Sequence, residues 1–497
     1  MPARQPILVG VGQLTNRPAE PREVVEPLEM MALAARRAAG DAGIPHRLAE
    51  VDSLTVINVI SRAYADPTGF LAARLGITAA DRVYTSMGGN SPQWRVNETA
   101  ERIARGEARL ALIAGAEAMY GLQLARRAGA KLDWAEAGAP AVVGDNRWGN
   151  NDVEQRHHAQ MPTNVYPLFE NALRARRNWS IERHRSHLAR LCARMAAVAR
   201  DNPYAWFRDG KTADEIAAVG ENNRMIAFPY PKFMNAIISV DQAAALLMTD
   251  VGTARALCIP ERKWVYVRGC GDAFDHWFVS ERVDFSSSPA LRLAGQYALA
   301  QARLRIDQLD HFDLYSCFPC AVQIAAEMLG IPIDDPRPLT VTGGLPYHGG
   351  PGNNYSTHAV ACMVERLRAQ PGSSGMVTGV GWYLTKHAVG IYSSVPPDHP
   401  FARPDPKRYQ HVVDDEAHPA LAVAGNGPGT VETYTVQHDR DGSPSVGIVV
   451  VRLADGRRCW ATIGDASTLE RIEREEFIGQ RGRVRHDATA QINVFEV

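Results

Sequence analysis

Short apolar runs alternate with alanine-rich stretches from residue 1 to about residue 120. The predicted strands are Ile7–Val11, Val51–Ile60 and Leu110–Ala114. The predicted helices are Pro27–Asp41, Pro67–Leu75 and Asn90–Gly106. The strands are apolar without alternation, which is typical of a sheet covered on both faces. The pattern therefore predicts a layered α/β architecture.

The pattern changes in the middle of the chain and then resumes. Residues from about 121 to 235 are rich in Arg, His, Asn, Trp and Pro, which indicates an inserted loop domain with helices at Leu168–Arg177 and Ile181–Arg200. From Ile237 onward the expected helices are Asp241–Met248, Pro289–Ala300, Cys320–Leu329 and Val360–Arg368. The expected strands are Trp264–Gly269, His311–Tyr315 and Gly375–Thr378. The same order on both sides of the insertion suggests an internal duplication.

A proline-rich stretch, Val395–Asp405, marks a linker to a different kind of domain. The β runs beyond it are Gly429–His438, Val446–Leu453, Arg458–Ile463, Gln480–Arg485 and Ile492–Val497, with a helix at Thr468–Glu475. Such strands with one helix between the third and the fourth predict a small OB-like barrel. The predicted domains are an N-terminal half (1–270), a C-terminal half (271–395), a linker (396–412) and the barrel domain (413–497).

The charge balance narrows the classes of partner. The 497 residues include 54 Lys+Arg and 55 Asp+Glu, so no global positive field attracts nucleic acid or an anionic membrane. No apolar stretch reaches the roughly 18 residues of a membrane span. We expect a cytoplasmic protein with reduced thiols. The 7 cysteines show no zinc-ligand spacing, and no metal is expected.

The barrel raises the question of single-stranded nucleic acid. Arg481, Arg483 and Arg485 form a basic strand, and Trp460 and Phe477 are possible stacking platforms. Four nearby glutamates balance that charge: Glu470, Glu473, Glu475 and Glu476. We expect the barrel to pack on the core and to bind no nucleic acid.

The segment Thr342–His358 (TGGLPYHGGPGNNYSTH) is too rich in Gly, Pro and Asn to form a regular element. Loops of this kind often hold catalytic side chains. The candidates in it are Tyr347, His348, Asn353, Asn354, Tyr355 and His358. The alternative is a tight structural turn in which His358 begins a helix. The segment does not end in Gly-Lys-Ser/Thr, so it is not a nucleotide P-loop.

A second segment, Asp313–Cys320 (DLYSCFPC), places polar side chains between a strand and a helix. In open α/β sheets, functional groups gather at the carboxyl ends of strands. Tyr315 could donate a proton or polarise a carbonyl group. For Cys317 and Cys320 a role as small buried hydrophobes is preferred to a nucleophilic or redox role.

Further motifs stand in a fixed order along the chain. They are AGAEAM at Ala114–Met119, NRMIAFPYPKFMNA and SVDQAAALLM within Asn223–Met248, YSCF at Tyr315–Phe318, and Gly343–Asn353. Together they resemble the thiolase superfamily, in particular its sterol-carrier-protein type and the thiolase-like subgroup. The resemblance extends from Gln5 to Val395. It implies a thiolase fold: two similar βαβ halves in α–β–α–β–α layers, here with an inserted loop domain and the added barrel.

The family's catalytic positions are not retained. The nucleophilic Cys falls at Gly89 in SMGGNSPQ, and the His that activates it falls at Gly350. The second Cys falls within Thr378–Gly381 (TGVG), and the residue that holds the thioester oxygen falls at Tyr315. Without a thiolate no acyl-enzyme can form. No cysteine occurs from Met1 to Leu191, so a shift in register does not restore one.

The resemblance also implies coenzyme A, carried by an acyl-CoA substrate, in a tunnel between loop domain and core. Arg183 and Arg190 on the arginine-rich helix are candidate phosphate ligands, although a solvated helix face is the preferred interpretation of its arginines. Asn353 and Asn354 are further candidates for binding it. We expect a homodimer or a monomer, since the added domain could cover the surface through which this family dimerises.

Two functions remain open. The first is an acyl-CoA-processing enzyme of lipid metabolism, on an acetyl-CoA acetyltransferase-like scaffold, with Tyr315, His348, Tyr347 and His358 as acid/base catalysts. One branch of the family lacks the Cys and cleaves β-hydroxyacyl-CoA by a retro-aldol reaction, with tyrosines and an OB-fold partner protein. The second is a catalytically inactive protein that binds CoA esters or lipids.

Overall fold

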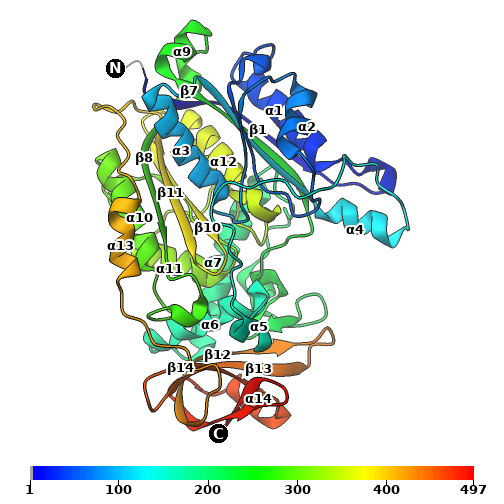
Figure 1. The fold of residues 1–497 in the computed structure, drawn as a ribbon, viewed down its shortest axis with the longest axis vertical. Helices are drawn as coiled ribbons and strands as arrows, with labels where there is room; N and C mark the ends of the chain where they lie inside the picture. The colour runs from blue at the N-terminus through cyan, green and yellow to red at the C-terminus, as the bar shows by residue number, and fades with distance from the viewer. Residues whose placement is uncertain (1–3) are drawn as a thin grey trace.

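The computed structural model describes residues 4–497, and a nine-stranded sheet forms its upper part in Figure 1. The strands lie in the order β3-β2-β4-β7-β1-β8-β11-β10-β9. Their bounds are β1 Pro6–Asn16, β2 Ser53–Val56, β3 Asp81–Tyr84, β4 Leu110–Ala118, β7 Asp241–Asp250, β8 Val265–Phe274, β9 His311–Asp313, β10 Ser374–Gly381 and β11 Lys386–Ser393.

The sheet consists of two halves joined by one short contact, because β1 and β8 pair only at Ile7 with Tyr266 and Leu8 with Val265. Two helices lie between the halves and contact strands of both: α3 Ser91–Arg105 and α12 Tyr355–Ala369. The outer helices are α1 Pro27–Asp41 and α2 Pro67–Leu75 on one half, and α10 Pro289–Ala302, with α11 Pro319–Leu329 beside it, on the other. This arrangement is the predicted α–β–α–β–α layering.

Both halves pack their outer helix in the same way. In β1, a Cβ at Gly10 or Gly12 would overlap backbone carbonyls one turn apart on α1. In β8, a Cβ at Gly269 or Gly271 would overlap backbone carbonyls one turn apart on α10. Glycines two residues apart on a strand thus match residues four apart on a helix face. This shared packing supports the predicted duplication.

One predicted helix is wrong: Asp241–Met248 lies within β7. Its alanines favour a helix when only local propensity counts. β7, however, pairs along its length with both β1 and β4 and is buried on both faces. Side chains buried on both faces leave no alternation in the sequence. Tertiary pairing therefore overrides the local preference.

Three core strands differ from the sequence-based expectations. The predicted strand Val51–Ile60 is too long, since β2 ends at Val56 and the chain then leaves the sheet. β3 and β11 were not expected. β3 is a short polar edge strand without the apolar run on which strand prediction depends. In β11 the apolar residues Ala388–Tyr392 follow Lys386 and His387 and are interrupted by Gly390.

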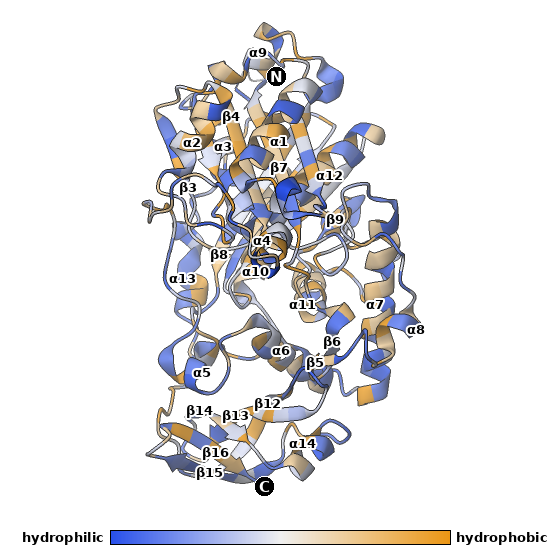
Figure 2. Cartoon of the chain, turned by 90° about the vertical axis from the view of Figure 1, so that its right-hand side faces the viewer, coloured by the Kyte–Doolittle hydropathy of each residue, from blue (hydrophilic) through white to orange (hydrophobic). Residues whose placement is uncertain are grey.

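The segment predicted as a loop domain lies below the sheet in Figure 1 and Figure 2. Its regular elements are mainly helices, and two of them correspond to the predicted helical stretches. Its elements are α4 Met119–Arg127, which begins it, α5 Asp152–Arg156, α6 Pro162–Arg176, α7 Ile181–Asp201, α8 Ala213–Ala217, β5 Met225–Ala227 and β6 Tyr230–Pro231. α9 Val251–Ala256 follows β7 in the core. α7 and α8 are capped at their N-termini by Ser180 and Thr212. Each of these side chains accepts a hydrogen bond from a backbone N–H in the first turn of its helix.

The C-terminal domain is a closed barrel at the bottom of Figure 1. Its elements are β12 Gly427–His438, β13 Pro444–Leu453, β14 Arg458–Ile463, α14 Ala466–Ile472, β15 Arg481–Asp487 and β16 Ile492–Glu496. The strand order is β12-β13-β14-β16-β15, and β15 pairs back to β12. β14 and β16 pair in parallel, and α14 lies between the third and fourth strands. The barrel thus has the predicted OB-like topology.

The barrel is joined to the loop domain, since β12 also pairs with β5 through Gln437 and Ala227. Trp460 lies buried at the interface with the core, where its indole N–H donates to the Ser280 hydroxyl (3.1 Å). Phe477 is buried in the barrel's own core. Neither ring offers a face on which a base could stack.

The stretch predicted as a linker, 396–412, is not a loose tether. It runs along the core and includes the start of α13 Lys407–Asp414 (Figure 1). The buried side chain of Arg403 is ion-paired with Asp272 (2.5 Å). The side-chain amide of Gln410 accepts from the N–H of Phe274 (2.8 Å) and donates to its carbonyl (2.7 Å). Prolines predict an extended chain, but these long-range contacts hold it in place.

Candidate functional site

Tyr315 follows the carboxyl end of β9 and precedes α11. Its ring is buried, and its backbone N–H donates to the Thr378 hydroxyl of β10 (2.8 Å). A Cβ built at Gly89, just before α3, would overlap the Tyr315 hydroxyl. The phenol therefore fills the space that a side chain at position 89 would occupy.

The Tyr315 hydroxyl is unpaired among the described residues. It forms no hydrogen bond with another residue of the described range 4–497. Burial raises the pKa of Tyr315 above its ordinary value. The phenol is therefore neutral at physiological pH and can donate a hydrogen bond or a proton.

A row of aromatic rings connects Tyr315 to two histidines. The ring centroids of Tyr315 and Tyr355 are 5.5 Å apart, and those of Tyr355 and His348 are 5.9 Å apart. His348 and His358 follow at 5.1 Å. The structure thus brings three of the four predicted catalytic residues into one cluster.

Both histidines are fully buried, and the Nε2 atom of each has no partner among the described residues. Burial lowers the pKa of His348 to about 4. Burial, and then the neighbouring His348, lower the pKa of His358. The Nδ1 atom of His358 lies 2.9 Å from Oε1 of Gln13. Both imidazoles are therefore neutral near pH 7, and a neutral imidazole nitrogen can accept a proton.

Asp313, at the end of β9, organises this cluster, and the sequence reasoning did not single it out. Its Oδ2 accepts from the Thr340 hydroxyl (2.8 Å), the Thr342 hydroxyl (3.0 Å) and the N–H of Val341 (3.0 Å). Its Oδ1 accepts from the Tyr355 hydroxyl (2.9 Å). The sequence does carry a signal for Asp313, because an acidic residue at the end of a buried strand needs hydrogen-bond partners close by.

Tyr347 is turned away from the ring row. Its hydroxyl donates to the carbonyl of Phe233 in the loop domain (3.0 Å). The N–H groups of Trp206 and Phe207 donate to the carbonyls of His348 and Tyr347, each at 2.8 Å. The glycine-rich segment is therefore held by the loop domain, and Tyr347 is part of that attachment.

The two asparagines brace the core. Oδ1 of Asn353 accepts from the N–H of Gly88 (2.8 Å), in the loop that precedes α3. Nδ2 of Asn354 donates to the carbonyl of Gly115 in β4 (2.7 Å). Both side chains are buried. These bonds engage the amide groups that were predicted to bind coenzyme A.

Arg183 and Arg190 are exposed on α7. The Arg183 guanidinium lies 4.6 Å from the ring centroid of Trp179, a cation–π contact. Neither arginine belongs to the Tyr315 cluster, and their role in phosphate binding stays a prediction.

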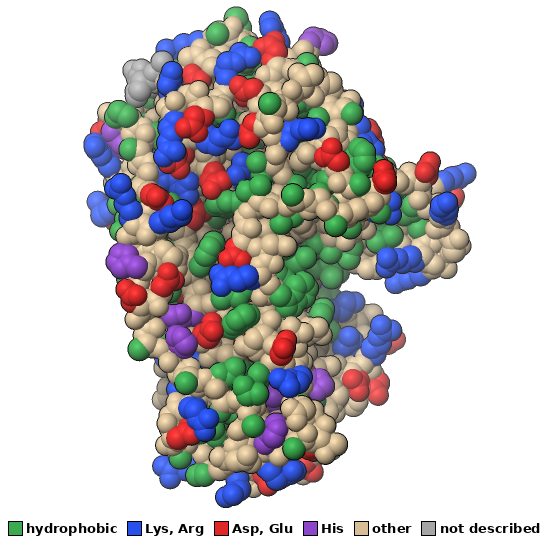
Figure 3. Space-filling view, in the orientation of Figure 1, with side chains coloured by type: hydrophobic (Ala, Val, Ile, Leu, Met, Phe, Trp, Pro, Cys, Tyr) green, Lys and Arg blue, Asp and Glu red, His purple; other side chains and the backbone are tan. Residues whose placement is uncertain are grey.

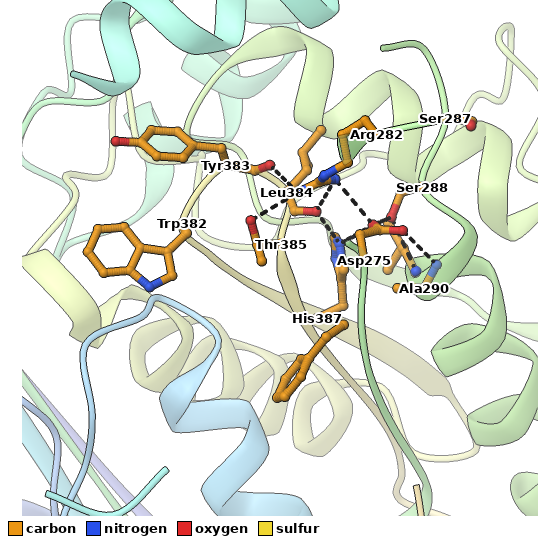
Figure 4. A network of polar contacts seen from close by, with 12 residues as sticks. Asp275, Arg282, Ser287, Ser288, Ala290, Trp382, Tyr383, Leu384, Thr385 and His387 are labelled. Atoms are coloured by element: carbon orange, nitrogen blue, oxygen red, sulfur yellow. Dashed lines mark hydrogen bonds and ion pairs between the residues drawn. The ribbon is translucent and has the colours of Figure 1, made fainter. Parts of the chain in front are cut away.

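His387 belongs to a separate polar network, which Figure 4 shows. Its Nε2 lies 3.1 Å from Oδ2 of Asp275 and 3.1 Å from the Ser288 hydroxyl, which also donates to that carboxylate (2.5 Å). A catalytic triad needs different imidazole nitrogens facing the acid and the hydroxyl. Here one nitrogen faces both. With Arg282, 3.6 Å from the carboxylate, the network holds the turn between β10 and β11.

Cys317 and Cys320 are buried free thiols, which confirms the preferred interpretation. Burial raises the pKa of Cys317 to about 12. Within residues 4–497, no group of three or more His, Cys, Asp or Glu side chains is placed to hold a metal ion. In the same range, no helix is long and apolar enough to cross a membrane.

The crowding at Gly89 leads to a first testable prediction. G89C is expected to lower the free energy of unfolding by about 1–3 kcal/mol, because its Cβ would overlap the Tyr315 hydroxyl and approach the Val380 carbonyl at 2.7 Å. Urea unfolding measures this loss, and G89C/Y315A is expected to recover part of it.

G350A is the matched control, since the nearest atom to a Cβ at Gly350 is 3.3 Å away. G350A is expected to change stability by less than about 1 kcal/mol. Equal stability of G89C and wild type would contradict the assignment of this space to Tyr315.

The comparisons with known proteins agree with the fold. Residues 409–489 match the family model of the thiolase-like protein type 1 additional C-terminal domain. A crystal structure of a monomeric SCP2-thiolase like protein type 1 from Mycobacterium smegmatis aligns over 100% of both chains, with 33% identity and a TM-score of 0.87. The chain belongs to the SCP2-thiolase-like proteins of type 1.

More distant structures share the thiolase fold over 79% of this type 1 thiolase-like protein. An Ltp2-ChsH2(DUF35) aldolase structure matches with 18% identity and a TM-score of 0.62, over 79% of this chain and 98% of the other. An acetyl-CoA acetyltransferase from Syntrophomonas wolfei matches with 15% identity and a TM-score of 0.55, over 79% and 99%. No curated protein sequence shows a significant match.

Proposed function

We propose that this type 1 thiolase-like protein acts on a CoA thioester by non-covalent acid/base chemistry, and that the reaction is retro-aldol cleavage of a β-hydroxyacyl-CoA. One observation carries the proposal: the unpaired Tyr315 hydroxyl lies where the side chain at position 89 would lie. A proton donor thus takes the place at which a thiolase has its nucleophile.

The proposed reaction uses one base and one donor. His348 accepts the β-hydroxyl proton, the bond between the α and β carbons breaks, and the β carbon becomes a carbonyl group. The electron pair passes into the thioester as an enolate, whose oxygen accepts a hydrogen bond from Tyr315. The proton held by His348 then passes to the α carbon, which yields a shorter acyl-CoA and restores the neutral imidazole. Both groups have the protonation state that the reaction needs near pH 7, since burial keeps the phenol protonated and the imidazole neutral.

A recess suited to coenzyme A supports the proposal. Figure 3 shows the molecule hollowed beneath the projecting α4, with hydrophobic side chains gathered in the recess and Lys and Arg side chains on its rims. The last turn of α4 supplies two exposed arginines, Arg126 and Arg127. An apolar floor suits the pantetheine arm, and basic rims suit the phosphates. No metal takes part in the proposed reaction.

The aldolase among the structural neighbours also supports this reaction. That protein is described as an aldolase, and it has the thiolase fold at 18% identity. We extend this activity to the present chain as part of the proposal. An acyl-CoA substrate would place the protein in lipid metabolism, and we propose that it acts in the cytoplasm.

A second candidate function is the binding of CoA esters without turnover. The observation that favours it is the complete burial of His348 and His358, whose Nε2 atoms lie enclosed. A base that no substrate reaches cannot act. The absence of both thiolase cysteines is also expected in a protein that has lost its catalytic activity during evolution.

A panel of β-hydroxyacyl-CoA and acyl-CoA substrates separates the two functions. The proposed aldolase is expected to release a shorter acyl-CoA and a carbonyl product, both followed by mass spectrometry, while the intact protein mass stays unchanged. Binding without product across the panel would support the second function. Absence of CoA binding would overturn both.

We also propose that the protein works as a monomer. The similar protein from M. smegmatis is described as monomeric. In the present chain the stretch 396–412 covers β8 through Arg403 and Gln410. Sedimentation equilibrium at micromolar concentration is expected to give the mass of one chain, 54.4 kDa. A stable dimer would contradict this proposal.

A further inference from the structure

A cavity of about 430 Å³ lies on the other side of the Gly89 loop, between α3, the end of β8, the start of β11 and residues 403–410. This is within the size range of small-molecule sites, about 300–1,000 Å³. Its lining includes the polar residues Ser86, Asn90 and Lys386 and the apolar residues Trp94, Phe274 and Pro406.

The carboxylates of this cavity are neutralised within the protein. Four of them have arginine partners: Glu98 with Arg95, Glu101 with Arg105, Asp145 with Arg147, and Asp272 with Arg403. The fifth, Asp405, is exposed and accepts from the N–H of Lys407 (3.0 Å). The acids around the cavity therefore present little uncompensated charge to a ligand.

Lys386 is different, because its side chain is 2% exposed and has no carboxylate within ion-pair distance among the described residues. Its Nζ donates to the carbonyls of Met87 (2.5 Å) and Asp145 (3.3 Å). An ammonium group has three donors, so one is left. Burial lowers the pKa of Lys386 to about 8, which leaves it mostly charged at pH 7. The Asp145 carboxylate attracts this charge, but it is ion-paired with Arg147 and lies beyond ion-pair distance of Lys386. A buried cation that is only partly balanced favours an anionic ligand.

Two further polar groups beside Lys386 lack partners. The Asn90 side chain is 5% exposed, and its Nδ2, the end that can donate to an anion, has no hydrogen-bond partner among residues 4–497. No other residue of the range 4–497 hydrogen-bonds to either end of this amide or to the buried Ser86 hydroxyl. Asn90 is also the residue that precedes α3, whose positive dipole end favours negative charge. Lysine, amide, hydroxyl and helix end thus lie at one wall of the cavity.

We propose that this cavity binds a small carboxylic acid, whose carboxylate accepts hydrogen bonds from Nζ of Lys386, Nδ2 of Asn90 and the Ser86 hydroxyl, with an apolar body against Trp94 and Phe274. This site lies outside the ring row of Tyr315 and does not depend on the proposed function. Lys386 also holds the Met87 carbonyl, two residues before Gly89, so an occupied cavity contacts the loop that packs on Tyr315.

Isothermal titration calorimetry on the full chain, without CoA, tests the proposal. The probes are phenylacetate, its neutral analogue phenylacetamide, and inorganic phosphate. Phenylacetate is expected to bind at least tenfold more tightly than either of the others, because only it combines a carboxylate with an apolar body. Equal affinity for the amide would overturn the role of charge, and equal affinity for phosphate would overturn the role of the apolar walls.

Variants then locate the site. K386M is expected to weaken phenylacetate binding at least tenfold, and K386R, which keeps the charge, is expected to restore part of it. K407M is the matched control, since Lys407 lines the same cavity but is exposed, and it is expected to bind as wild type does. Thermal unfolding checks that each variant is folded. Unchanged binding in a folded K386M, or no binding of phenylacetate to wild type, would overturn the proposal.

Discussion

Y315F is expected to reduce retro-aldol turnover at least a hundredfold, the size of effect that removal of a positioned proton donor produces. The reason is that the thioester enolate would lose its hydrogen-bond donor while the shape of the ring is kept. The hydroxyl has no partner among the described residues, so its loss leaves no orphaned group. Stability is therefore expected to change by less than about 1 kcal/mol. Steady-state kinetics on the most active β-hydroxyacyl-CoA gives kcat, and thermal unfolding gives the stability.

Y347F is the matched control for this experiment. The Tyr347 hydroxyl donates to the Phe233 carbonyl and lies away from the ring row, so this variant is expected to lose about 1 kcal/mol of stability with kcat nearly unchanged. If Y315F keeps the turnover of wild type, or if Y347F loses as much turnover as Y315F, the donor has been assigned to the wrong residue.

The second large effect concerns the attachment of the barrel. R458M is expected to lower the free energy of unfolding by about 3–5 kcal/mol, the cost of removing one partner from a buried charged network. Arg458 is fully buried in β14, and its Nε donates to Oε2 of Glu432 (2.7 Å). Its Nη1 donates across the domain interface to the carbonyls of Ser280 (2.9 Å) and Arg282. Methionine would leave these carbonyls without their donor.

Urea unfolding followed by tryptophan fluorescence measures this loss, since Trp460 lies at the same interface. Faster proteolysis within 396–412 would show that the barrel detaches first. R452M is the control, because Arg452 binds the same Glu432 but is 32% exposed. It is expected to cost less than about 1 kcal/mol. Equal losses in the two variants would mean that burial of Arg458 adds nothing.

The architecture was largely predictable from the sequence because its signals are local or ordered along the chain. Helices such as Pro27–Asp41 carry a proline at the first turn and alanines on one face. The barrel strands are separated by clear turns. The order of the motifs from AGAEAM to Gly343–Asn353 then predicts the thiolase fold. The segment that forms β7 was predicted as a helix because its alanines have a high helix propensity. Its partners β1 and β4 are distant in the sequence, so the pairing could not be inferred locally.

For the candidate site, too, some features follow from the sequence and others only from the tertiary structure. The sequence by itself determined that neither thiolase cysteine is present and that Tyr315, His348 and His358 are candidates. Only the tertiary structure decided that the Tyr315 phenol fills the space beside Gly89 and that Tyr347 faces the loop domain. Lys386 gave no signal in the sequence at all. Residue types and their spacing can be read from the sequence. Burial, pKa and the position of the Tyr315 phenol beside Gly89 arise only when distant segments pack together.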